Sequence, residues 1–323
     1  MRRPVFSLVK VLALTLVLAA FPGERAFATS TDWSAIQSAM QVDGNVLPDG
    51  VLRFELARTD VGDITVNGQK INLNESASGF VSYKPVGGGW FFADGSIPVR
   101  DSESEMIQEA LRQDRHIHIT AVANRLSQET PAMLWIHFEA VENGASLAGS
   151  IAAALAKINS PQNVLVVPGT QNIIQPGDIP PPLQNLFDKG YLEQLGSSIV
   201  FYLPRPDEKR ISLGWVPASF GLGVAQSFYI TILGGVDSEI VTMDVDFALR
   251  KDEIQPVSDI LRKGGFAVTA QSNNYVDDDP NLYYVHVYAT GNGFDFAAPL
   301  FVAVQYIEAS SKHDHDHDHG HGW

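Results

Sequence analysis

Thr120 to Phe138 reads TAVANRLSQETPAMLWIHF, and Thr269 to Val287 reads TAQSNNYVDDDPNLYYVHV. The two stretches share Thr, Ala, Asn, Pro and His at one constant spacing, and an acidic residue, Glu129 or Asp278, stands at the same place in each. Self-similarity at a fixed spacing indicates a duplicated structural unit. Because each stretch has the strand–turn–strand pattern of a hairpin, we expect one such hairpin in each half of the chain.

A second, independent match supports the duplication. A strand-like segment from Val51 to Asp60 is repeated from Ile199 to Asp207. Four residues of the first segment correspond in order to four of the second: Phe54, Leu56, Arg58 and Asp60 to Phe201, Leu203, Arg205 and Asp207. The chain therefore divides into an export signal at 1–28, a first repeat domain at 29–168, a Pro-rich linker at 169–182, a second repeat domain at 183–310 and a disordered His/Asp-rich tail at 311–323.

Hydrophobic periodicity and turn signals predict an α+β fold. In the first repeat the expected order is strand, helix, strand, strand, helix, strand, with the strands at 90–99, 116–124, 133–140 and 163–167, the first helix beginning at a capping box of Ser102 and Glu105, and the second helix at 145–158. This is the order of a ferredoxin-like βαββα(β) unit. The second repeat has the same pattern, with strands at 240–249, 266–275 and 282–289 and helices at 252–263 and 296–307. Extra strands precede each unit, among them a hairpin at 63–73, and short helices are expected at 31–40 and 183–195.

The N-terminus has the features of an export signal. A basic start is followed by an apolar run and a small-x-small cleavage site, which lie at Arg2, Arg3 and Lys10, at Val11 to Phe21, and at Ala26 to Ala28. Such a segment is too short to span a membrane, and no later segment is long and apolar enough. We therefore expect a periplasmic or extracellular protein without a membrane span.

Composition excludes several classes of function. The chain contains no Cys, which excludes disulfides, thiolate metal sites and Cys nucleophiles. Its formal net charge of −15 argues against nucleic acid or an anionic membrane as partner. No motif for an organic cofactor is present: Gly87 to Gly89 lies between predicted strands and does not open a helix, as a phosphate cradle would.

An ordered set of short matches resembles the LppY/LpqO family of exported bacterial proteins, which have a duplicated domain of unknown function. The matching residues lie at Ala57 to Asp60, Tyr83 to Gly89, Gly95 to Val99, Thr120 to Leu126 and Pro131 to Phe138. The family hairpin typically carries His-Asn-His or His-Ser-His, where this chain has Ala123-Asn124-Arg125 and Ser272-Asn273-Asn274. A family Gly-Asp is Gly95-Ser96 in the first copy and Val245-Asp246 in the second. If the family site is a His/Asp metal or acid–base site, the resemblance implies that most of it is lost here.

The later His of the hairpin is present in both copies, as His137 and His286. Strand alternation places these residues on the same face as Trp135 and Tyr284. That face is either a binding cleft or a packed surface on which each His is buried and hydrogen-bonded. The candidates for catalysis are His137, His286 and Asp246, with Glu129 or Asp278 as further acidic neighbours.

Other recurring polar residues are candidates for ligand binding. Arg58 and Arg205 could clamp an anion, or could form strand-end ion pairs with the Asp two residues later. Asn124 and Asn273 recur at the hairpin turn. His116 and His118 stand two apart and could ligate a divalent ion, or could belong to an exposed strand face.

The C-terminal tail carries the clearest metal-ligating pattern. Imidazoles alternate with carboxylates at His313, Asp314, His315, Asp316, His317, Asp318, His319 and His321. A flexible segment of this kind can surround Zn²⁺, Ni²⁺ or Cu²⁺ with several imidazoles, and Cu²⁺ should bind most tightly.

Three functions remain open from the sequence. The first is a non-enzymatic exported binding protein for divalent metal ions and for an unknown small molecule or envelope component. The second is an envelope hydrolase with a site between the repeats that uses His137 or His286 as acid or base. The third is a structural or surface-assembly protein.

Overall fold

Two six-stranded antiparallel sheets, one from each sequence repeat, form the centre of the computed structural model. The structure describes residues 31–58, 60–66, 68–71, 77–158, 189–195, 198–233 and 240–318. Every helix and strand described belongs to one compact unit, Trp33–Trp323.

The two sheets have the same strand order. The first is β1 (Asn45–Val46), β2 (Leu52–Ala57), β5 (Ser78–Gly87), β6 (Trp90–Arg100), β9 (Met133–Asn143) and β7 (Ile117–Ala123). The second is β10 (Tyr191–Leu195), β11 (Ser198–Pro204), β14 (Ala225–Ile232), β15 (Ile240–Leu249), β18 (Tyr283–Asn292) and β16 (Ala267–Ser272). This equivalence confirms the predicted duplication and the α+β class.

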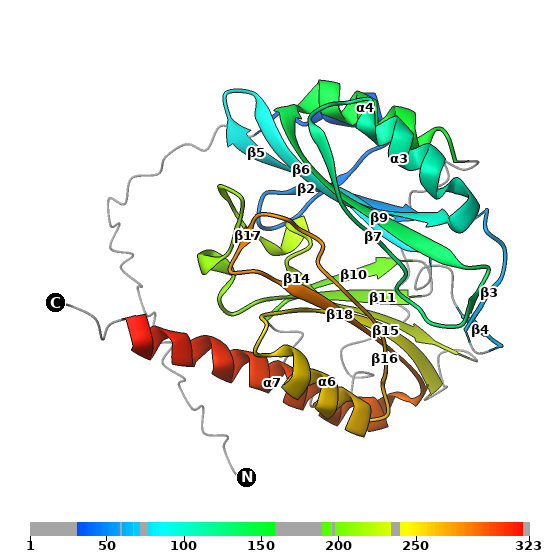
Figure 1. Cartoon of the computed structure of the whole chain (residues 1–323), viewed down its shortest axis with the longest axis vertical. Coiled ribbons are helices and arrows are strands. Elements are labelled where there is room, and N and C mark those ends of the chain that lie inside the picture. The colour runs from blue at the N-terminus through cyan, green and yellow to red at the C-terminus, as the bar shows by residue number, and fades with distance from the viewer. Residues whose placement is uncertain are drawn as a thin grey trace, which may run out of the picture. The chain divides into compact units, whose positions relative to one another are not determined.

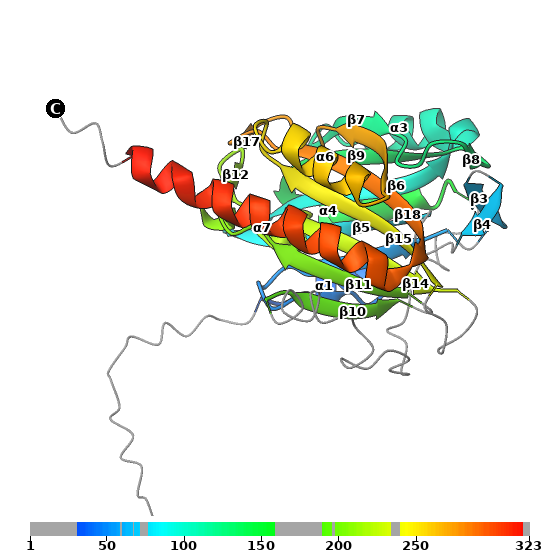
Figure 2. The same cartoon turned by 90° about the horizontal axis from the view of Figure 1, so that it is seen from below.

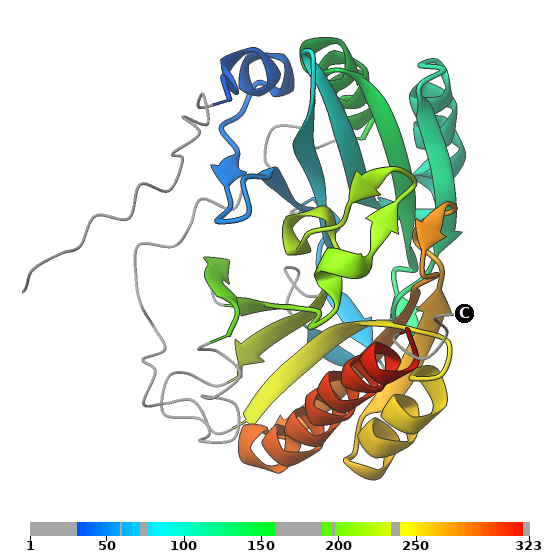
Figure 3. The ribbon, with the colours of Figure 1, turned by 90° about the vertical axis from the view of Figure 1, so that its left-hand side faces the viewer.

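Helices cover the outer face of each sheet (Figures 1 and 3). They are α1 (Ser34–Met40), α3 (Ser104–Arg112) and α4 (Gly144–Leu155) on the first sheet, and α6 (Ile254–Lys263) and α7 (Gly293–Asp318) on the second. The buried stripes of α3 and α6, Ile107 with Leu111 and Val257 with Leu261, belong to the core beneath them. The resulting order is helices, sheet, sheet, helices, so the two inner sheet faces meet each other (Figure 1).

Two small three-stranded sheets lie beside the large ones. Their members are β3 (Ile64–Val66), β4 (Gln69–Ile71) and β8 (Glu129–Thr130) in one, and β12 (Ser212–Leu213), β13 (Val216–Pro217) and β17 (Asp278–Asp279) in the other. The expected hairpin at 63–73 is therefore confirmed as β3 and β4. In each repeat the turn of the long hairpin supplies the third strand, β8 or β17, as Figure 2 shows for β17 beside β12.

The ferredoxin-like unit is recognisable with one difference in its fourth strand. Within β5-β6-β9-β7, strands β6, β7 and β9 with α3 and α4 follow the predicted strand, helix, strand, strand, helix order. The position beside β6 is occupied by β5, which precedes the unit in the chain. The predicted closing strand at 163–167 lies outside the described residues, as do the export signal at 1–28 and the linker at 169–182.

Two predictions at the chain level were wrong. The segment expected as a helix at 183–195 ends as strand β10, whose residues pair with β11 from Tyr191↔Tyr202 to Leu195↔Ser198; cross-strand pairing outweighs its helical periodicity. The tail expected to lack regular structure from Ser311 continues helix α7 to Asp318. The helix is held there by the buried Ser311, whose carbonyl accepts from Arg210 Nη2 at 2.8 Å, and each further residue needs only one more backbone bond.

A buried ion cluster joins the start of each repeat to its first long helix. Arg205 Nε lies 2.8 Å from Asp207 Oδ1, and Arg205 Nη1 lies 2.8 Å from Glu253 Oε2. Arg205 also donates to the Ala248 carbonyl at 2.5 Å. Burial alone would raise the pKa of Asp207, but the hydrogen bonds and charge of Arg205 lower it. This cluster therefore contributes stability above the ordinary Asp pKa, and the contribution is lost as the pH falls through the lowered value.

The first repeat has the same cluster. Arg58 Nε lies 2.7 Å from Asp60 Oδ1, and Arg58 Nη1 lies 2.7 Å from Glu103 Oε2. Arg58 donates to the Pro98 carbonyl at 3.2 Å, at the place that Ala248 occupies in the second repeat. Arg58 and Arg205 thus fix the turn after their strands, and their guanidinium groups are occupied by carboxylates.

Glu253→Gln should lower the free energy of unfolding by about 3–5 kcal/mol, because it removes one charge from a buried ion cluster and leaves Arg205 without its full partner. Glu253 is fully buried and accepts from Arg205, Arg250 N and Ser310 Oγ. Urea unfolding measures the change. Glu105→Gln, an exposed position on α3, is the matched control and should change stability by no more than about 0.5 kcal/mol. A loss below about 1 kcal/mol for Glu253→Gln would contradict the assigned role.

Candidate functional site

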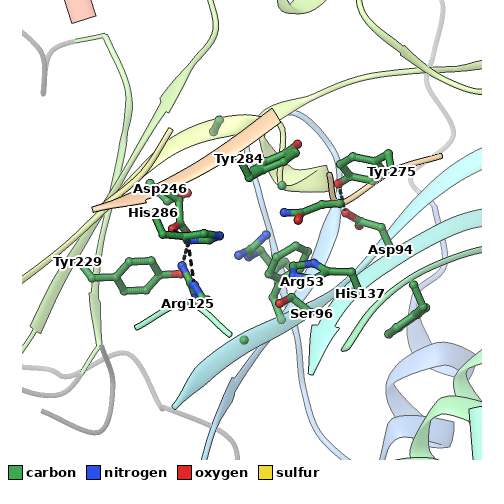
Figure 4. A pocket seen from close by; sticks show the side chains of 18 residues that line it. Arg53, Asp94, Ser96, Arg125, His137, Tyr229, Asp246, Tyr275, Tyr284 and His286 are labelled. Atoms are coloured by element: carbon green, nitrogen blue, oxygen red, sulfur yellow. Dashed lines mark hydrogen bonds and ion pairs between the residues drawn. The ribbon is translucent and has the colours of Figure 1, made fainter. Parts of the chain in front are cut away.

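A polar cavity of about 40 Å³ lies between the two sheets and receives side chains from both repeats (Figure 4). That volume has room for roughly three water molecules, at about 10–15 Å³ each. The polar residues that line it are Arg53, Asp94, Ser96, Arg125, His137, Ser227, Tyr229, Asp246, Asn274, Tyr275, Tyr284 and His286.

One half of the cavity wall is built on the second sheet and completed by the first repeat. Asp246 of β15 and His286 of β18 are cross-strand partners, so both side chains stand on the inner face. Arg125 follows β7 in the hairpin of the first repeat and forms an ion pair with Asp246. Arg125 Nε lies 3.2 Å from His286 Nδ1, and Asp246 Oδ1 contacts the same Nδ1. Figure 4 shows these three side chains meeting beside Tyr229.

The other half is built on the first sheet and completed by the second repeat. Ser96 of β6 and His137 of β9 are cross-strand partners at the positions equivalent to Asp246 and His286. Tyr275, from the hairpin of the second repeat, donates to Asp94 Oδ2 at 2.6 Å. The neighbouring Asn274 carbonyl accepts from Thr120 Oγ1 at 2.6 Å. Each hairpin therefore reaches across to the half-site carried by the other repeat.

Both imidazoles are held in the neutral form. Burial lowers the pKa of His286 to about 3, and the positive charge of Arg125 acts in the same direction. Burial also lowers the pKa of His137 to about 3, with His286 and Arg125 contributing. The charge of Asp244 would favour a charged ring at His286, but burial and Arg125 outweigh it. Nδ1 of the neutral His286 either donates to Asp246 or accepts from Arg125 Nε, according to the tautomer, and Arg125 is paired with the same carboxylate.

Several carboxyl groups around the cavity have raised pKa values. Burial raises the pKa of Asp94 to about 7, against the hydrogen bond from Tyr275. Burial raises the pKa of Glu129 to about 8, and the charge of Asp244 adds to this. Asp244 itself is fully buried, its pKa is raised by burial, and its Oδ2 lies 4.0 Å from Arg125 Nη2. Arg125 is thus the cation nearest to several buried acids.

Two buried polar atoms of cavity-lining residues, Asp94 Oδ1 and Tyr284 Oη, have no hydrogen-bond partner among the described residues. Asp94 is 1% exposed and its Oδ1 makes no hydrogen bond within the described part of the chain. Both carboxylate oxygens of the nearby Asp244 are likewise buried without a hydrogen bond among these residues. Buried polar atoms are nearly always paired, so an unpaired carboxylate oxygen on a cavity-lining residue indicates a missing partner such as water or a ligand.

The structure brings together the three residues named for catalysis. His137, His286 and Asp246 all line the cavity, as does Tyr284. Trp135 does not line it: this side chain is fully buried in an apolar cluster, and its Nε1 donates to the Ser78 carbonyl at 2.7 Å.

The remaining predicted ligand-binding residues also lie outside the cavity wall. Asn124 and Asn273 are exposed, while Arg58 and Arg205 belong to the ion clusters described above. Glu129 and Asp278 do not line the cavity either. Each caps its own hairpin turn instead, accepting from Met133 N at 3.3 Å and from Leu282 N at 2.6 Å.

Sequence reasoning missed Arg125, Asp94 and Tyr275. The signal for Asp94 was available, because Asp94 and Asp244 recur at equivalent positions of β6 and β15, two residues before Ser96 and Asp246. Arg125 had no such signal. Its role depends on a hairpin that crosses to the other repeat, and periodicity within one strand contains no information on that crossing.

Within the described residues, no group of three or more His, Asp or Glu side chains is arranged to hold a metal ion. The side chains of His313 to Asp318 and all of residues 319–323 lie outside that description. Among the helices that the structure describes, none is both long and apolar enough to cross a membrane.

A family profile described as "Domain of Unknown Function (DUF1259)" matches the chain twice, at residues 34–157 and 183–306. The chain belongs to this family. The two matches cover more than half of the sequence and coincide with the two sheets and their helices. The family assignment thus confirms the duplicated domain.

No curated protein sequence matches this chain. A solved structure that aligns with it is the crystal structure of a trimeric bacterial microcompartment shell protein, PduB. The two are 9% identical, over 80% of this chain and 86% of that one, with a TM-score of 0.19. At that score the likeness supports no inference about fold or function.

Both interior imidazoles should remain neutral at pH 5, because burial holds the pKa of His137 and of His286 at about 3. A folded pKa below the ordinary value of about 6.5 means that the contribution to stability is complete above that pH and is lost as the pH falls towards about 3. Nitrogen-15 NMR of the imidazoles, with His137→Gln and His286→Gln for assignment, measures the protonation state. A urea-unfolded sample at pH 5 is the control and should show only imidazolium. Imidazolium signals from both residues in the folded protein would refute the assignment.

Proposed function

We propose that this protein is an exported, non-enzymatic binding protein whose cavity between the sheets takes a small polar molecule. The observation that carries the proposal is Asp94 Oδ1, a buried oxygen of a cavity-lining residue that has no hydrogen-bond partner among the described residues. A pre-formed cavity with a few convergent polar groups is the usual form of a small-molecule site. Export is supported by the signal pattern of residues 1–28.

The charges around the cavity favour a neutral ligand that forms hydrogen bonds. Arg53 is paired with Glu55, and Arg125 with Asp246, so each guanidinium already has a carboxylate. The imidazoles are neutral, and Asp94 exchanges its proton near pH 7. With a volume of about 40 Å³, the cavity suits a solute of only a few non-hydrogen atoms.

A hydrolase is the second candidate, because Asp246 and His286 form a hydrogen-bonded pair in the cavity wall. A carboxylate that orients a neutral imidazole is the arrangement of a general base. Hydrolysis of p-nitrophenyl acetate by the wild type that disappears in His286→Gln would favour this candidate. Equal rates for the two proteins would leave the binding function as the better description.

The C-terminal segment is proposed to bind Zn²⁺, Ni²⁺ or Cu²⁺. The proposal rests on the alternation of imidazoles and carboxylates in the sequence from His313 to His321. Binding requires neutral imidazole and should weaken below about pH 6.5, the ordinary His pKa.

The narrower family resemblance, to the LppY/LpqO proteins, belongs with these proposals. It rests on the ordered short matches described for the sequence, and it supports a location in the cell envelope. A structural or assembly role remains the third proposal, and light scattering that finds only monomer would argue against it.

Protein purified from its native compartment should carry a small molecule in the cavity that Asp94→Leu cannot retain, because leucine fills similar space without an oxygen. Mass spectrometry of the extract from heat-denatured protein measures the amount per chain, which we expect to fall at least about tenfold. Glu105→Gln is the control and should retain the molecule. A wild-type extract that contains no specific molecule would contradict the cavity-binding function.

Calorimetric titration with Cu²⁺ and Zn²⁺ should show at least micromolar binding by the full chain and no comparable binding by a form that ends at Ser311. Cu²⁺ should bind more tightly than Zn²⁺. Elemental analysis of protein purified without a chelator tests whether metal is bound in the native compartment. Equal titrations of the two forms would refute the role of the tail.

A further inference from the structure

A second cavity, of about 200 Å³, lies at an end of the first sheet, where the β12–β13 hairpin of the second repeat approaches strands β7 and β9. It shares no lining residue with the cavity between the sheets. Its wall consists of Phe92, His116, His118, Glu139, Ala140, Val141, Leu213, Gly214, Trp215 and Asp277. Apart from aliphatic residues and one glycine, this wall contains only acidic, imidazole and aromatic side chains.

At the equivalent place in the other repeat, apolar and small residues replace the acidic and imidazole side chains. Glu139 of β9 corresponds to Tyr288 of β18, which is buried in an apolar cluster with the β3–β4 hairpin. His118 corresponds to Ala267, and Trp215 stands where the other turn has Gly68. The polar character of this wall is therefore particular to one repeat. It is not a by-product of the shared fold.

The cavity has an excess of negative charge. Glu139 makes no hydrogen bond or ion pair with any other described residue, and it lies opposite His118 in the β7–β9 register. Burial raises the pKa of Glu139 to about 7, and the charges of Asp277 and Asp278 add to this. No Lys or Arg lines the cavity; Arg115 is adjacent and its Nε donates to His116 Nε2 at 3.3 Å. A cation placed beside Glu139 would relieve this repulsion.

Trp215 supplies the surface on which such a cation could stack. Its side chain is 66% exposed, in the wall of the cavity and at the tip of the β12–β13 hairpin. A tryptophan ring face attracts organic cations more strongly than other aromatic rings do. An indole beside carboxylates is therefore suited to an alkylammonium or guanidinium group.

A bare metal ion fits this cavity less well. The acidic and imidazole side chains of the cavity are not arranged as a metal site, since the described residues contain no group of three His, Asp or Glu side chains that could hold a metal ion. The volume of about 200 Å³ is also that of an organic molecule, because a cavity of about 150 Å³ accommodates a benzene ring. We propose that this cavity binds a small organic cation, with its charged group between Glu139 and Asp277 and its apolar part against Trp215.

Titration of the full chain with choline and with butylammonium, followed by calorimetry and by tryptophan fluorescence, tests the proposal. The neutral isostere 3,3-dimethylbutan-1-ol is the matched probe without charge. We expect saturable binding of both cations and at least about tenfold weaker binding of the alcohol, since the acidic wall gains nothing from a neutral ligand.

Two variants locate the site. Glu139→Gln should weaken choline binding at least about tenfold, and Trp215→Ala about two- to fivefold. Glu142→Gln on the same strand and Trp90→Ala, an exposed tryptophan elsewhere, are the matched controls and should bind as the wild type does. Urea unfolding confirms that each variant is folded, and the exposed Trp215→Ala provides the test if Glu139→Gln does not fold.

Three results would overturn the proposal: no saturable binding of either cation by the wild type, equal affinity for choline and the alcohol, or unchanged binding in both Glu139→Gln and Trp215→Ala. None of these results bears on the cavity between the sheets, because the two cavities have no lining residue in common.

Discussion

The ion pair between Arg125 and Asp246 is the interaction on which the packing of the two sheets against each other depends. Facing sheets bury the polar groups of their inner strands, and a buried carboxylate is costly unless a cation or hydrogen-bond donors accompany it. Arg125 extends from the first repeat and forms an ion pair with Asp246 of the second. Its Nη2 lies 4.0 Å from Asp244 Oδ2, and its Nε lies 3.2 Å from His286 Nδ1. The guanidinium also lies over the Trp135 ring, 5.3 Å from its centroid. One side chain thus compensates acids on the opposite sheet while packing against an aromatic residue of its own repeat.

Both the duplication and the main elements could be predicted from sequence, because they depend on local signals. The constant spacing between the long hairpins, the turn signals of the hairpin at 63–73 and the helical periodicity each specify structure within a few residues. Strand alternation placed His137 and His286 on one face of their strands, and in the structure that face is the inner one. The prediction failed where distant segments decide the outcome, as for Tyr191 to Leu195, which pairs as strand β10.

The candidate site was predictable only in part for the same reason. His137, His286 and Asp246 were named because they recur or stand at informative positions, and the fold brings them to one cavity. Trp135 was expected to floor that cavity, yet it is buried in an apolar cluster under the β3–β4 hairpin, a covering that its own strand cannot reveal. Arg58 and Arg205 illustrate the opposite case: the Asp two residues later suggested an ion pair, and Glu103 and Glu253 complete it from the next helix.

The crossing of the two hairpins has a consequence for how such a protein can be assembled. Neither repeat holds a whole site, since Arg125 completes the half on the second sheet and Tyr275 the half on the first. A single repeat expressed alone would expose its inner sheet face and could complete its site only with a second copy of itself. The present chain is in this sense a dimer joined into one polypeptide. Because the two repeats are joined in one chain, their sequences do not have to be identical, as those of a homodimer must be. Ser96 therefore stands opposite His137 in the first repeat, while Asp246 stands opposite His286 in the second.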